Sequence, residues 1–430
     1  MSKIIKIGKR TFASLKIRNY RLFFIGQSIS LIGTWMQTIG QGILVLQITG
    51  SGTILGTVIA LQFLPILILG PFGGVIADRF PKRNMLYITQ TLAGLLALLF
   101  GFLVITHEIK IWMVELLALS LGLVNTIDNP VRQSFISELV GRENLSNAVS
   151  LNSSIANVAR VIGPAIAGIL ILTIGIAMCF IVNGISYIAV LIVLSFMKKE
   201  EFLLVQKKII GSSIQTLKEG FVYVKSSPVL LTVLLMMTLI GMLSYEFSVL
   251  LPLYSQFTFH GNAGTYAALT GAMGFGAVIG GLFAASRKKI TPQMVVTAAL
   301  FFGIAILIAS VAPSLPYALS AMVMVGICSV NFMSLANSNL QIASKPEMRG
   351  RVMSLWTVAF LGTTPIGSPI IGWISQYQGP RMGFIVGGVA ALLAAWYGHR
   401  ALKKMTAHAF PSGEMLPIAE LEVEKISQIR

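Results

Sequence analysis

Two ionisable side chains, Arg160 and Glu246, stand within long apolar stretches of the chain. A guanidinium in such surroundings costs at least about 2.5 kcal/mol unless it is paired, so Arg160 is expected to face the protein interior. Its planar fork of donors suits an anionic or oxygen-rich ligand, and it suits a permanent pair with a carboxylate or backbone carbonyls equally well. Glu246 follows Tyr245 in a polar cluster, and we predict that its carboxyl takes up and releases protons.

A third charged group, Asp128, is followed four residues later by Arg132. This spacing places both side chains on one face of a helix, where they can form an ordinary ion pair. A carboxyl near the end of an apolar helix can also carry a proton. Asp128 is therefore a second candidate for proton coupling, with the structural ion pair as the alternative.

Polar side chains recur every three or four residues in three of the apolar stretches, so each set lies along one helix face. A polar stripe of this kind requires water, a ligand or a polar partner. We predict that the three stripes line one shared cavity. The stripes are Gln27, Ser30, Thr34, Gln37 and Gln41; Ser150, Ser153, Asn157 and Arg160; and Asn331, Ser334, Ser338 and Gln341. The residues predicted to bind substrate in the cavity are Gln37, Gln41, Asn157, Arg160, Asn331 and Tyr245.

The composition of the chain indicates which elements carry these residues. Of 430 residues, 55% are hydrophobic and only 11% are charged, and the mean hydropathy is +0.82. Soluble domains carry about 25% charged residues, so an ordinary soluble enzyme is excluded.

Twelve apolar stretches are long enough to cross a bilayer, and each must be an α-helix because lipid offers the backbone no hydrogen-bond partners. Spans three, six, nine and twelve are mostly apolar through their middles and are predicted to face lipid. The predicted spans are 22–47, 53–76, 84–106, 111–131, 148–173, 176–197, 229–255, 264–286, 292–312, 315–340, 352–377 and 382–399.

The net charge of +17 carries information about membrane topology. All but three of the 32 Lys and Arg residues fall in the N-terminal segment, in alternate loops or in the C-terminal tail, the exceptions being Lys110, Arg381 and Arg160. Basic loops stay on the cytoplasmic side, so both termini are predicted to be cytoplasmic. Because the charge is divided among seven separate segments, nucleic acid is not an expected partner.

The longest internal polar segment divides the spans six and six. A shift of 204 residues places Gly163 and Gly168 on Gly367 and Gly372, which supports two parallel repeats with a binding site between them near the membrane midplane. We predict an N-terminal half at 1–197, a linker at 198–228, a C-terminal half at 229–402 and a cytoplasmic tail at 403–430. Apolar linker residues at helical spacing also predict a short helix on the membrane surface. These residues are Ile214, Leu217, Phe221 and Val224.

In the loop after the second span, Gly74 is followed by Asp78 and Arg79 and then by the basic pair Lys82 and Arg83. This pattern resembles the signature of the major facilitator superfamily, in which a glycine precedes Asp-Arg and a basic pair. The resemblance implies an all-α fold of twelve transmembrane helices in two pseudo-symmetric halves. A carboxylate in this short loop can pair with an adjacent helix N-terminus in one conformation and release it in another, so we predict a gating role; the alternative is a solvated charge that only enforces topology. Pro81 stands where the family usually has glycine, and Ala285 replaces the aspartate in the second-half copy. The matching residues are Gly74, Asp78, Arg79, Lys82 and Arg83.

Two further segments resemble the drug-efflux branch of this superfamily. The fifth span contains a segment similar to the antiporter motif of that branch, with Ala167 in place of one glycine. Residues 125–133 and 145–148 resemble bacterial exporters of the macrolide-efflux and enterobactin-exporter group, which implies a bacterial inner membrane. Glycine and proline permit close helix contact and a bend, so the antiporter-like motif is predicted to serve helix packing. Its residues are Gly163, Pro164 and Gly168 and, in the second half, Gly367, Pro369 and Gly372.

Together these features predict a secondary transporter and not an enzyme. We expect a proton-coupled exporter, or antiporter, of small hydrophobic or amphiphilic molecules such as drugs or a siderophore, working by alternating access. The alternative is uptake or facilitated transport of a polar or anionic small molecule. The sequence holds no zinc-binding, catalytic or phosphate-cradling pattern, so no cofactor is expected. The expected partners are the substrate, protons and the lipid bilayer, and the chain is expected to act as a monomer.

Overall fold

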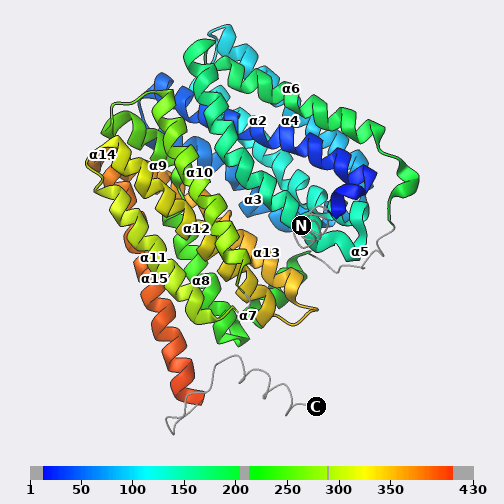
Figure 1. Cartoon of the computed structure of the whole chain (residues 1–430), viewed down its shortest axis with the longest axis vertical. Helices are drawn as coiled ribbons and strands as arrows, with labels where there is room; N and C mark the ends of the chain where they lie inside the picture. Colours follow the sequence, from blue (N-terminus) through cyan, green and yellow to red (C-terminus); the bar gives the residue numbers. More distant parts are fainter. Residues whose placement is uncertain (1–12, 204–212, 288–289, 410–430) are drawn as a thin grey trace, which may run out of the picture.

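A computed structural model shows the chain as a bundle of long α-helices (Figure 1). It describes residues 13–203, 213–287 and 290–409. Within these ranges, twelve helical segments are long and apolar enough to cross a membrane, which confirms the predicted fold. The elements of the N-terminal half and linker are η1 (Ser14–Lys16), α2 (Arg18–Thr49), α3 (Gly52–Arg79), α4 (Lys82–Ile105), α5 (Ile111–Thr173), α6 (Ala177–Phe196), η2 (Lys199–Glu201) and α7 (Ser213–Ser226). The later elements are α8 (Pro228–Leu243), α9 (Phe247–Leu253), the π-helical turn η3 (Tyr254–Thr258), α10 (Ala263–Ala285), α11 (Pro292–Ser310), α12 (Leu315–Ala343), α13 (Arg349–Phe360), α14 (Thr364–Gln378) and α15 (Pro380–Ala409).

A single glycine divides α5 into two spans. Gly141 has φ 70° and ψ 178°, a backbone conformation that residues with a side chain rarely adopt. The chain turns there, so the first arm of α5 (Ile111–Gly141) and the second arm (Glu143–Thr173) are separate spans. The first arm runs beyond the predicted end of the fourth span because Phe135 and Leu139 are buried in the N-terminal half.

The seventh and eleventh spans are each interrupted by a short break in the helix. In the seventh span α8 ends at Leu243, and Glu246 leaves helical geometry, with φ −79° and ψ 38°, just before α9. In the eleventh span α13 ends at Phe360 and α14 begins at Thr364. The two interruptions pack together, since a Cβ added to Gly241 would lie 3.2 Å from the carbonyl oxygen of Phe360. Irregular backbone at membrane depth is tolerated where protein or a cavity covers it.

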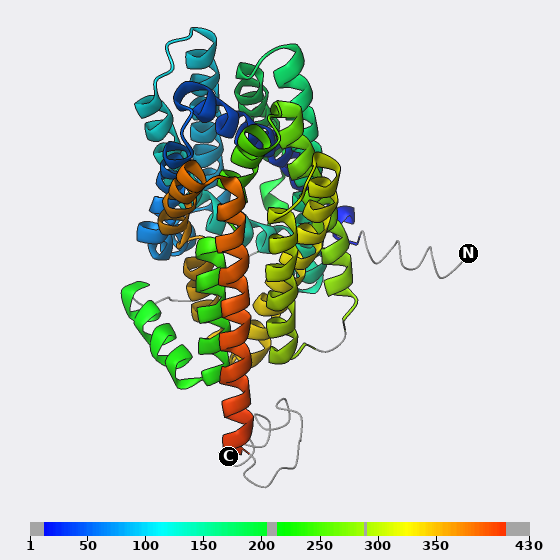
Figure 2. The same cartoon turned by 90° about the vertical axis from the view of Figure 1, so that its left-hand side faces the viewer.

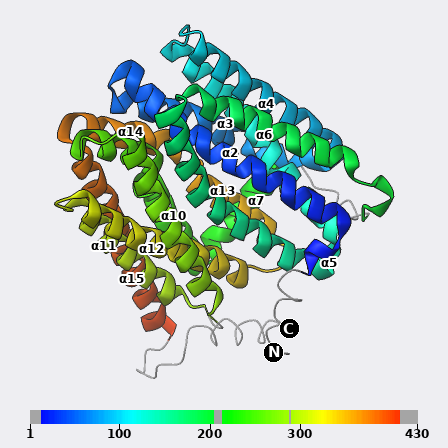
Figure 3. The ribbon, with the colours of Figure 1, turned by 45° about the horizontal axis from the view of Figure 1, so that its top comes forward.

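The two halves lie side by side, with α2–α6 in one and α8–α15 in the other (Figures 1 and 3). They meet where α3 packs on α14 and where α5 packs on α10. Glycines bring the backbones close at both contacts. A Cβ added to Gly56 would meet the carbonyl oxygen of Ser368, and one added to Gly168 would lie 3.0 Å from the Cβ of Ala267. The halves are therefore joined through small residues, which permit close helix approach.

The two ends of the bundle differ in charge. One end holds loops 50–51, 106–110, 174–176, 259–262, 311–314 and 379, and we call it the sparse face because these loops hold a single Lys or Arg residue, Lys110. The opposite end, the basic face, holds the Lys- and Arg-containing loops and both described chain ends, residues 13 and 409. The close contact of the halves at α3 and α14 reaches the sparse face, where the Gly52 amide donates to Gln376 Oε1 at 2.6 Å.

The outer surface of the bundle is apolar. Many helices expose several large apolar side chains each, far more than a soluble protein leaves uncovered. They include α4, α6, α11 and α15, the third, sixth, ninth and twelfth spans that the sequence predicted to face lipid, and also α5, α10 and α14. The exposed residues include Leu95, Leu99 and Phe102; Ile185, Ile188 and Ile192; Leu300, Phe301 and Ile304; and Val389, Leu393 and Trp396.

Candidate functional site

A cavity of about 180 Å³ lies between the two halves, and we call it the interface chamber. Its walls come from the first, second and fifth spans on one side and from the seventh, eighth, tenth and eleventh spans on the other. Both helix interruptions open onto it. The lining residues are Trp35, Thr38, Ile59, Phe63, Arg160, Tyr245, Glu246, Phe247, Ser248, Leu251, Tyr266, Thr270, Met273, Ser329, Val330, Met333, Phe360, Leu361 and Thr364.

Two groups of opposite charge in the chamber walls have unsatisfied polar atoms. The Nε of Arg160 is buried without a hydrogen-bond partner, and its guanidinium carbon lies 5.1 Å from the centroid of the Trp35 ring. Glu246 is only 2% exposed, and its Oε1 also lacks a partner. An unsatisfied buried polar group costs about 1–3 kcal/mol, and more when it is charged. A ligand that supplies an acceptor to Arg160 and a donor to Glu246 would remove this cost.

The chamber lining also includes six aromatic side chains, Trp35, Phe63, Tyr245, Phe247, Tyr266 and Phe360. The Tyr245 ring lies 5.1 Å from Phe302 and 5.2 Å from Phe360, and its hydroxyl donates to the carbonyl oxygen of Ser329 at 2.6 Å. Contacts with several rings and a hydrogen bond fix the position of Tyr245. The chamber thus presents two charged groups on a firm apolar wall, which suits an amphiphilic molecule.

Close backbone packing sets the position of Glu246. A Cβ added to Gly367 of α14 would meet the carbonyl oxygen of Met242 and would lie 3.0 Å from Glu246 Oε1. Glycine is therefore required at 367 for α14 to approach the end of α8. This contact holds the Glu246 carboxyl at the meeting point of the two interrupted spans.

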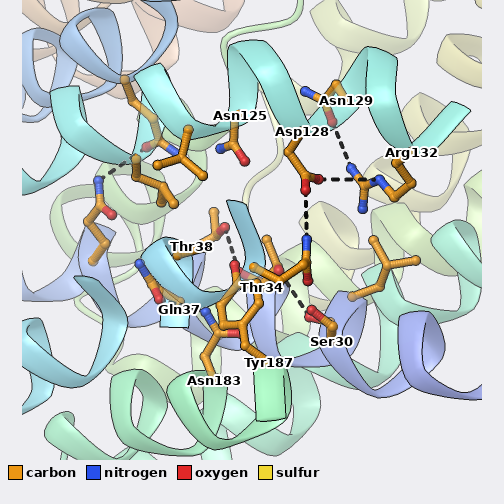
Figure 4. A pocket seen from close by; sticks show the side chains of 17 residues that line it. Ser30, Thr34, Gln37, Thr38, Asn125, Asp128, Asn129, Arg132, Asn183 and Tyr187 are labelled. Carbon is orange, nitrogen blue, oxygen red and sulfur yellow. Dashed lines mark hydrogen bonds and ion pairs between the residues drawn. The ribbon is translucent and has the colours of Figure 1, made fainter. Parts of the chain in front are cut away.

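A second cavity, of about 170 Å³, lies within the N-terminal half, and we call it the polar pocket (Figure 4). Its walls come from α2, α3, α4, α5 and α6, and most of them are amide, hydroxyl or charged groups. Thr38 lines both this pocket and the interface chamber, so the two cavities are neighbours. The lining residues are Ser30, Leu31, Thr34, Gln37, Thr38, Gln41, Gln62, Gln90, Ala93, Leu121, Val124, Asn125, Asp128, Asn129, Arg132, Asn183 and Tyr187.

Asp128 is the best-partnered group in the polar pocket. Its Oδ1 accepts hydrogen bonds from Thr89 Oγ1 at 2.6 Å and Gln90 Nε2 at 2.8 Å, and its Oδ2 lies 3.6 Å from Arg132 Nε. Arg132 also donates to Gln27 Oε1 at 3.0 Å. These contacts tie α2, α4 and the first arm of α5 together. The arrangement favours the structural ion pair over proton coupling for Asp128.

A family model described as transmembrane secretion effector (MFS_3) matches residues 9–427. The chain belongs to this family of the major facilitator superfamily. The Staphylococcus aureus staphyloferrin A transporter is 25% identical over 394 residues, which cover 89% of this chain and 97% of that protein. Macrolide efflux protein A of Streptococcus pyogenes is 22% identical over 391 residues, covering 88% of this chain and 96% of that protein.

Solved structures agree on the fold of this family member. The inward-facing, unoccupied form of a bacterial homologue of the human lysosomal transporter Spinster superimposes with a TM-score of 0.73 at 15% identity, covering 90% of this chain and 96% of that one. The chain is therefore a multi-pass membrane transporter of small molecules and not an enzyme, and some of its relatives are named as efflux proteins.

The predicted substrate residues do not lie in one cavity. Arg160 and Tyr245 lie in the interface chamber, whereas Gln37 and Gln41 lie in the polar pocket. There Gln37 Oε1 accepts from Asn183 Nδ2 at 2.6 Å, and Gln41 Nε2 donates to Gln62 Oε1 at 3.3 Å.

Two further predicted substrate residues are outside the lining of both cavities. Asn157 lies on α5 facing Gly281 of α10, and Asn331 of α12 has a buried Oδ1 with no hydrogen-bond partner. The first polar stripe thus lines the polar pocket, the second reaches the interface chamber through Arg160, and the third lines neither of these cavities, so the stripes do not share one cavity.

Several chamber residues were not singled out from the sequence, among them Trp35, Thr38 and Phe360. Aromatic residues in an apolar span look the same whether they face lipid or a cavity. The interruption of the eleventh span did leave a signal, because Pro365 follows Thr364 and the residue before a proline disfavours helix.

The predicted gating residues make contacts inside the N-terminal half. Lys82 Nζ lies 3.0 Å from Glu138 Oε1, and Arg83 donates to the carbonyl oxygen of Leu194 through Nε at 2.9 Å. These contacts join α4 to α5 and α6, and Arg79 is exposed. The side chains of Gly74 and Asp78 lie outside the part of the chain that the structure describes.

The predicted helix-packing residues lie at helix contacts. A Cβ added to Gly163 would lie 2.9 Å from the carbonyl oxygen of Ile32 in α2, and Gly168 faces α10. In the second half Gly367 faces α8, and a Cβ added to Gly372 would meet the carbonyl oxygen of Gly52 in α3. The accompanying prolines, Pro164 and Pro369, stand inside α5 and α14.

Proposed function

We propose that this transporter is a proton-coupled exporter of small amphiphilic molecules, working by alternating access at the interface chamber. The observation that carries the proposal is the placement of Glu246 at a helix interruption, with an unsatisfied carboxyl oxygen facing a chamber built by both halves. A carboxyl at such a site gains or loses a proton according to which side of the membrane it meets. Movement of the halves around the chamber would change that side.

The efflux relatives support export. Proteins named as a staphyloferrin A transporter and a macrolide efflux protein align along nearly their whole lengths with this chain. We place the transporter in the bacterial inner membrane with the basic face and both termini in the cytoplasm, because basic loops are retained on that side. We propose that it acts as a monomer, with substrate, protons and lipid as its partners.

Arg160 supports a substrate with an anionic or oxygen-rich group. Its donors form a planar fork that matches a carboxylate, and the aromatic wall beside it accepts an apolar part. A siderophore with carboxylate groups combines both features, and a macrolide offers many oxygen atoms on an apolar frame. In this proposal Arg160 and Tyr245 bind substrate, Glu246 couples transport to protons, and Asp128 holds the N-terminal half together.

The test uses purified protein in liposomes with an imposed pH gradient, and follows the movement of staphyloferrin A and of a macrolide. We expect accumulation against the substrate gradient that stops when the pH gradient is collapsed. Glu246→Gln should abolish the gradient-driven movement. Glu115→Gln, which removes a half-buried carboxyl from the first arm of α5, is the matched control and should leave transport intact. Uphill transport by Glu246→Gln at the control's rate would refute the assignment of Glu246.

The second candidate is uptake or facilitated passage of a polar or anionic molecule. The polar pocket favours it, because amide and hydroxyl groups line a cavity next to the chamber. The same liposomes separate the two functions when the pH gradient is reversed. An exporter moves substrate against the proton flow, an uptake system moves substrate with it, and a facilitator ignores the gradient.

A further inference from the structure

The linker helix α7 presents two chemically distinct faces. The face turned away from the bundle carries Lys218, Phe221, Val222 and Lys225, at the i, i+3, i+4, i+7 spacing of a single helical stripe. All four are exposed, Phe221 by 59% and Val222 by 66%. We call these four residues the outer stripe. Two apolar side chains flanked by two lysines form an amphipathic surface that water alone does not satisfy.

The other face of α7 is fixed to the C-terminal half. Glu219 Oε2 lies 2.7 Å from Arg351 NH1, and the Lys345 amide donates to the Tyr223 hydroxyl at 3.0 Å. Val224 is buried in the core. The predicted stripe, which placed Phe221 and Val224 on one membrane-facing side, is therefore wrong: Val224 faces the bundle and Phe221 faces away. Because these contacts set the rotation of α7, the direction of the outer stripe is fixed too.

The place of α7 identifies what the outer stripe meets. The helix ends at Ser226, and the seventh span begins at Pro228, so α7 lies at the membrane boundary of the basic face. Figure 2 shows α7, in green, angled away from the bundle at its lower left. Side chains exposed at this level meet lipid headgroups. Phenylalanine and valine gain by entering the headgroup boundary, and lysines there attract anionic phosphates.

We propose that the outer stripe of α7 binds the headgroups of anionic phospholipids, with Phe221 and Val222 entering the bilayer surface and Lys218 and Lys225 pairing with phosphates. The ion pair between Glu219 and Arg351 connects α7 to α13, so lipid bound to α7 would also hold α13 at the membrane surface. Helix α13 ends at Phe360, which lines the chamber. The binding claim is independent of the transported substrate and of proton coupling.

The experiment measures lipid retention by native mass spectrometry of the full-length protein in detergent, with phosphatidylglycerol and phosphatidylcholine as probes. The wild-type protein should retain phosphatidylglycerol preferentially. Attraction of each lysine to an anionic surface implies that Lys218→Gln with Lys225→Gln weakens this preference by up to about 30-fold. The matched control, Lys16→Gln with Lys403→Gln, removes two exposed lysines outside α7 and its contacts and should keep the preference.

Two more variants distinguish a loss of lipid binding from a folding defect. Lys218→Arg with Lys225→Arg keeps both charges and should retain the preference, whereas Phe221→Ser should weaken retention of both lipids without changing their ratio. Equal phosphatidylglycerol retention by the glutamine double variant and the control would overturn the proposal. Loss of the preference in the arginine variant as well would also overturn it, because charge would then not be the cause.

Discussion

The contact of α3 with α14 at the sparse face predicts the effect of one added methyl group. Gly56 is packed so closely that its Cβ would meet the carbonyl oxygen of Ser368 and lie 3.0 Å from the Cα of Pro369. Backbone atoms cannot move aside as a flexible side chain can. Gly56→Ala should therefore force the two helices apart and favour the state in which the sparse face is open.

The magnitude follows from the cost of overpacking. Inserting a methyl group into a closely packed contact costs about 1–3 kcal/mol. A change of that size moves a two-state equilibrium by about 5–150-fold. Alanine also favours helix over glycine by about 1 kcal/mol, but that gain is common to both states and to any helical glycine. The matched control is Gly70→Ala on the same helix, where the nearest atom is Ile66 Cγ2 at 3.9 Å.

The assay is a distance distribution between spin labels on the two halves. Labels at the exposed positions Leu172 and Tyr377 report separation at the sparse face, with the two native cysteines replaced by alanine. Gly56→Ala should increase the population of long distances, and Gly70→Ala should match the parent protein. Identical distributions for both variants would show that the contact does not hold the sparse face closed, and the reasoning would fail.

Two further predictions concern the charged groups. Arg160→Lys keeps the charge but loses the planar fork, so binding of the substrate that the liposome test identifies, measured by calorimetry, should weaken by about 10-fold or more; unchanged affinity would remove Arg160 from the substrate site. Asp128→Ala leaves Arg132 without its carboxylate, and breaking a buried pair costs about 3–5 kcal/mol, so the thermal unfolding temperature in detergent should fall well below that of Glu138→Ala. Glu138 faces Lys82 at 3.0 Å, whereas Asp128 also accepts hydrogen bonds from Thr89 and Gln90, so Glu138→Ala leaves fewer polar groups unsatisfied; equal shifts would contradict the structural role of Asp128.

The twelve spans were predictable from length and hydropathy alone. In lipid the backbone groups of a single segment can be satisfied only by the hydrogen bonds of a helix. The interruptions at Glu246 and before Thr364 were not predictable in the same way. They depend on how helices far apart in the chain fit together, as where Gly241 meets the end of α13 and Gly367 meets the end of α8. Periodicity within one helix carries no record of such contacts.

The candidate site shows the same limit. Arg160 and Glu246 were identified from the sequence because an ionisable side chain in an apolar span is costly unless it has a partner or a ligand. Both line the interface chamber. The polar stripe that includes Gln37 was also identified. Its spacing shows which residues share a helix face, but it does not show which element packs against that face. The neighbours of Gln37 proved to be α6 and the polar pocket, so the stripe serves the N-terminal half.

The most direct test of alternating access is to tether the halves at the sparse face. Gln376 reaches the amide of Gly52, so cysteines at Ser51 and Gln376 can be joined by a short, reductant-cleavable thiol reagent in a protein without native cysteines. Each single-cysteine variant treated with the reagent serves as a control. We predict that tethered protein in liposomes stops pH-driven transport and that reductant restores it. Transport by the tethered protein at the untreated rate would contradict movement of the two halves around the interface chamber.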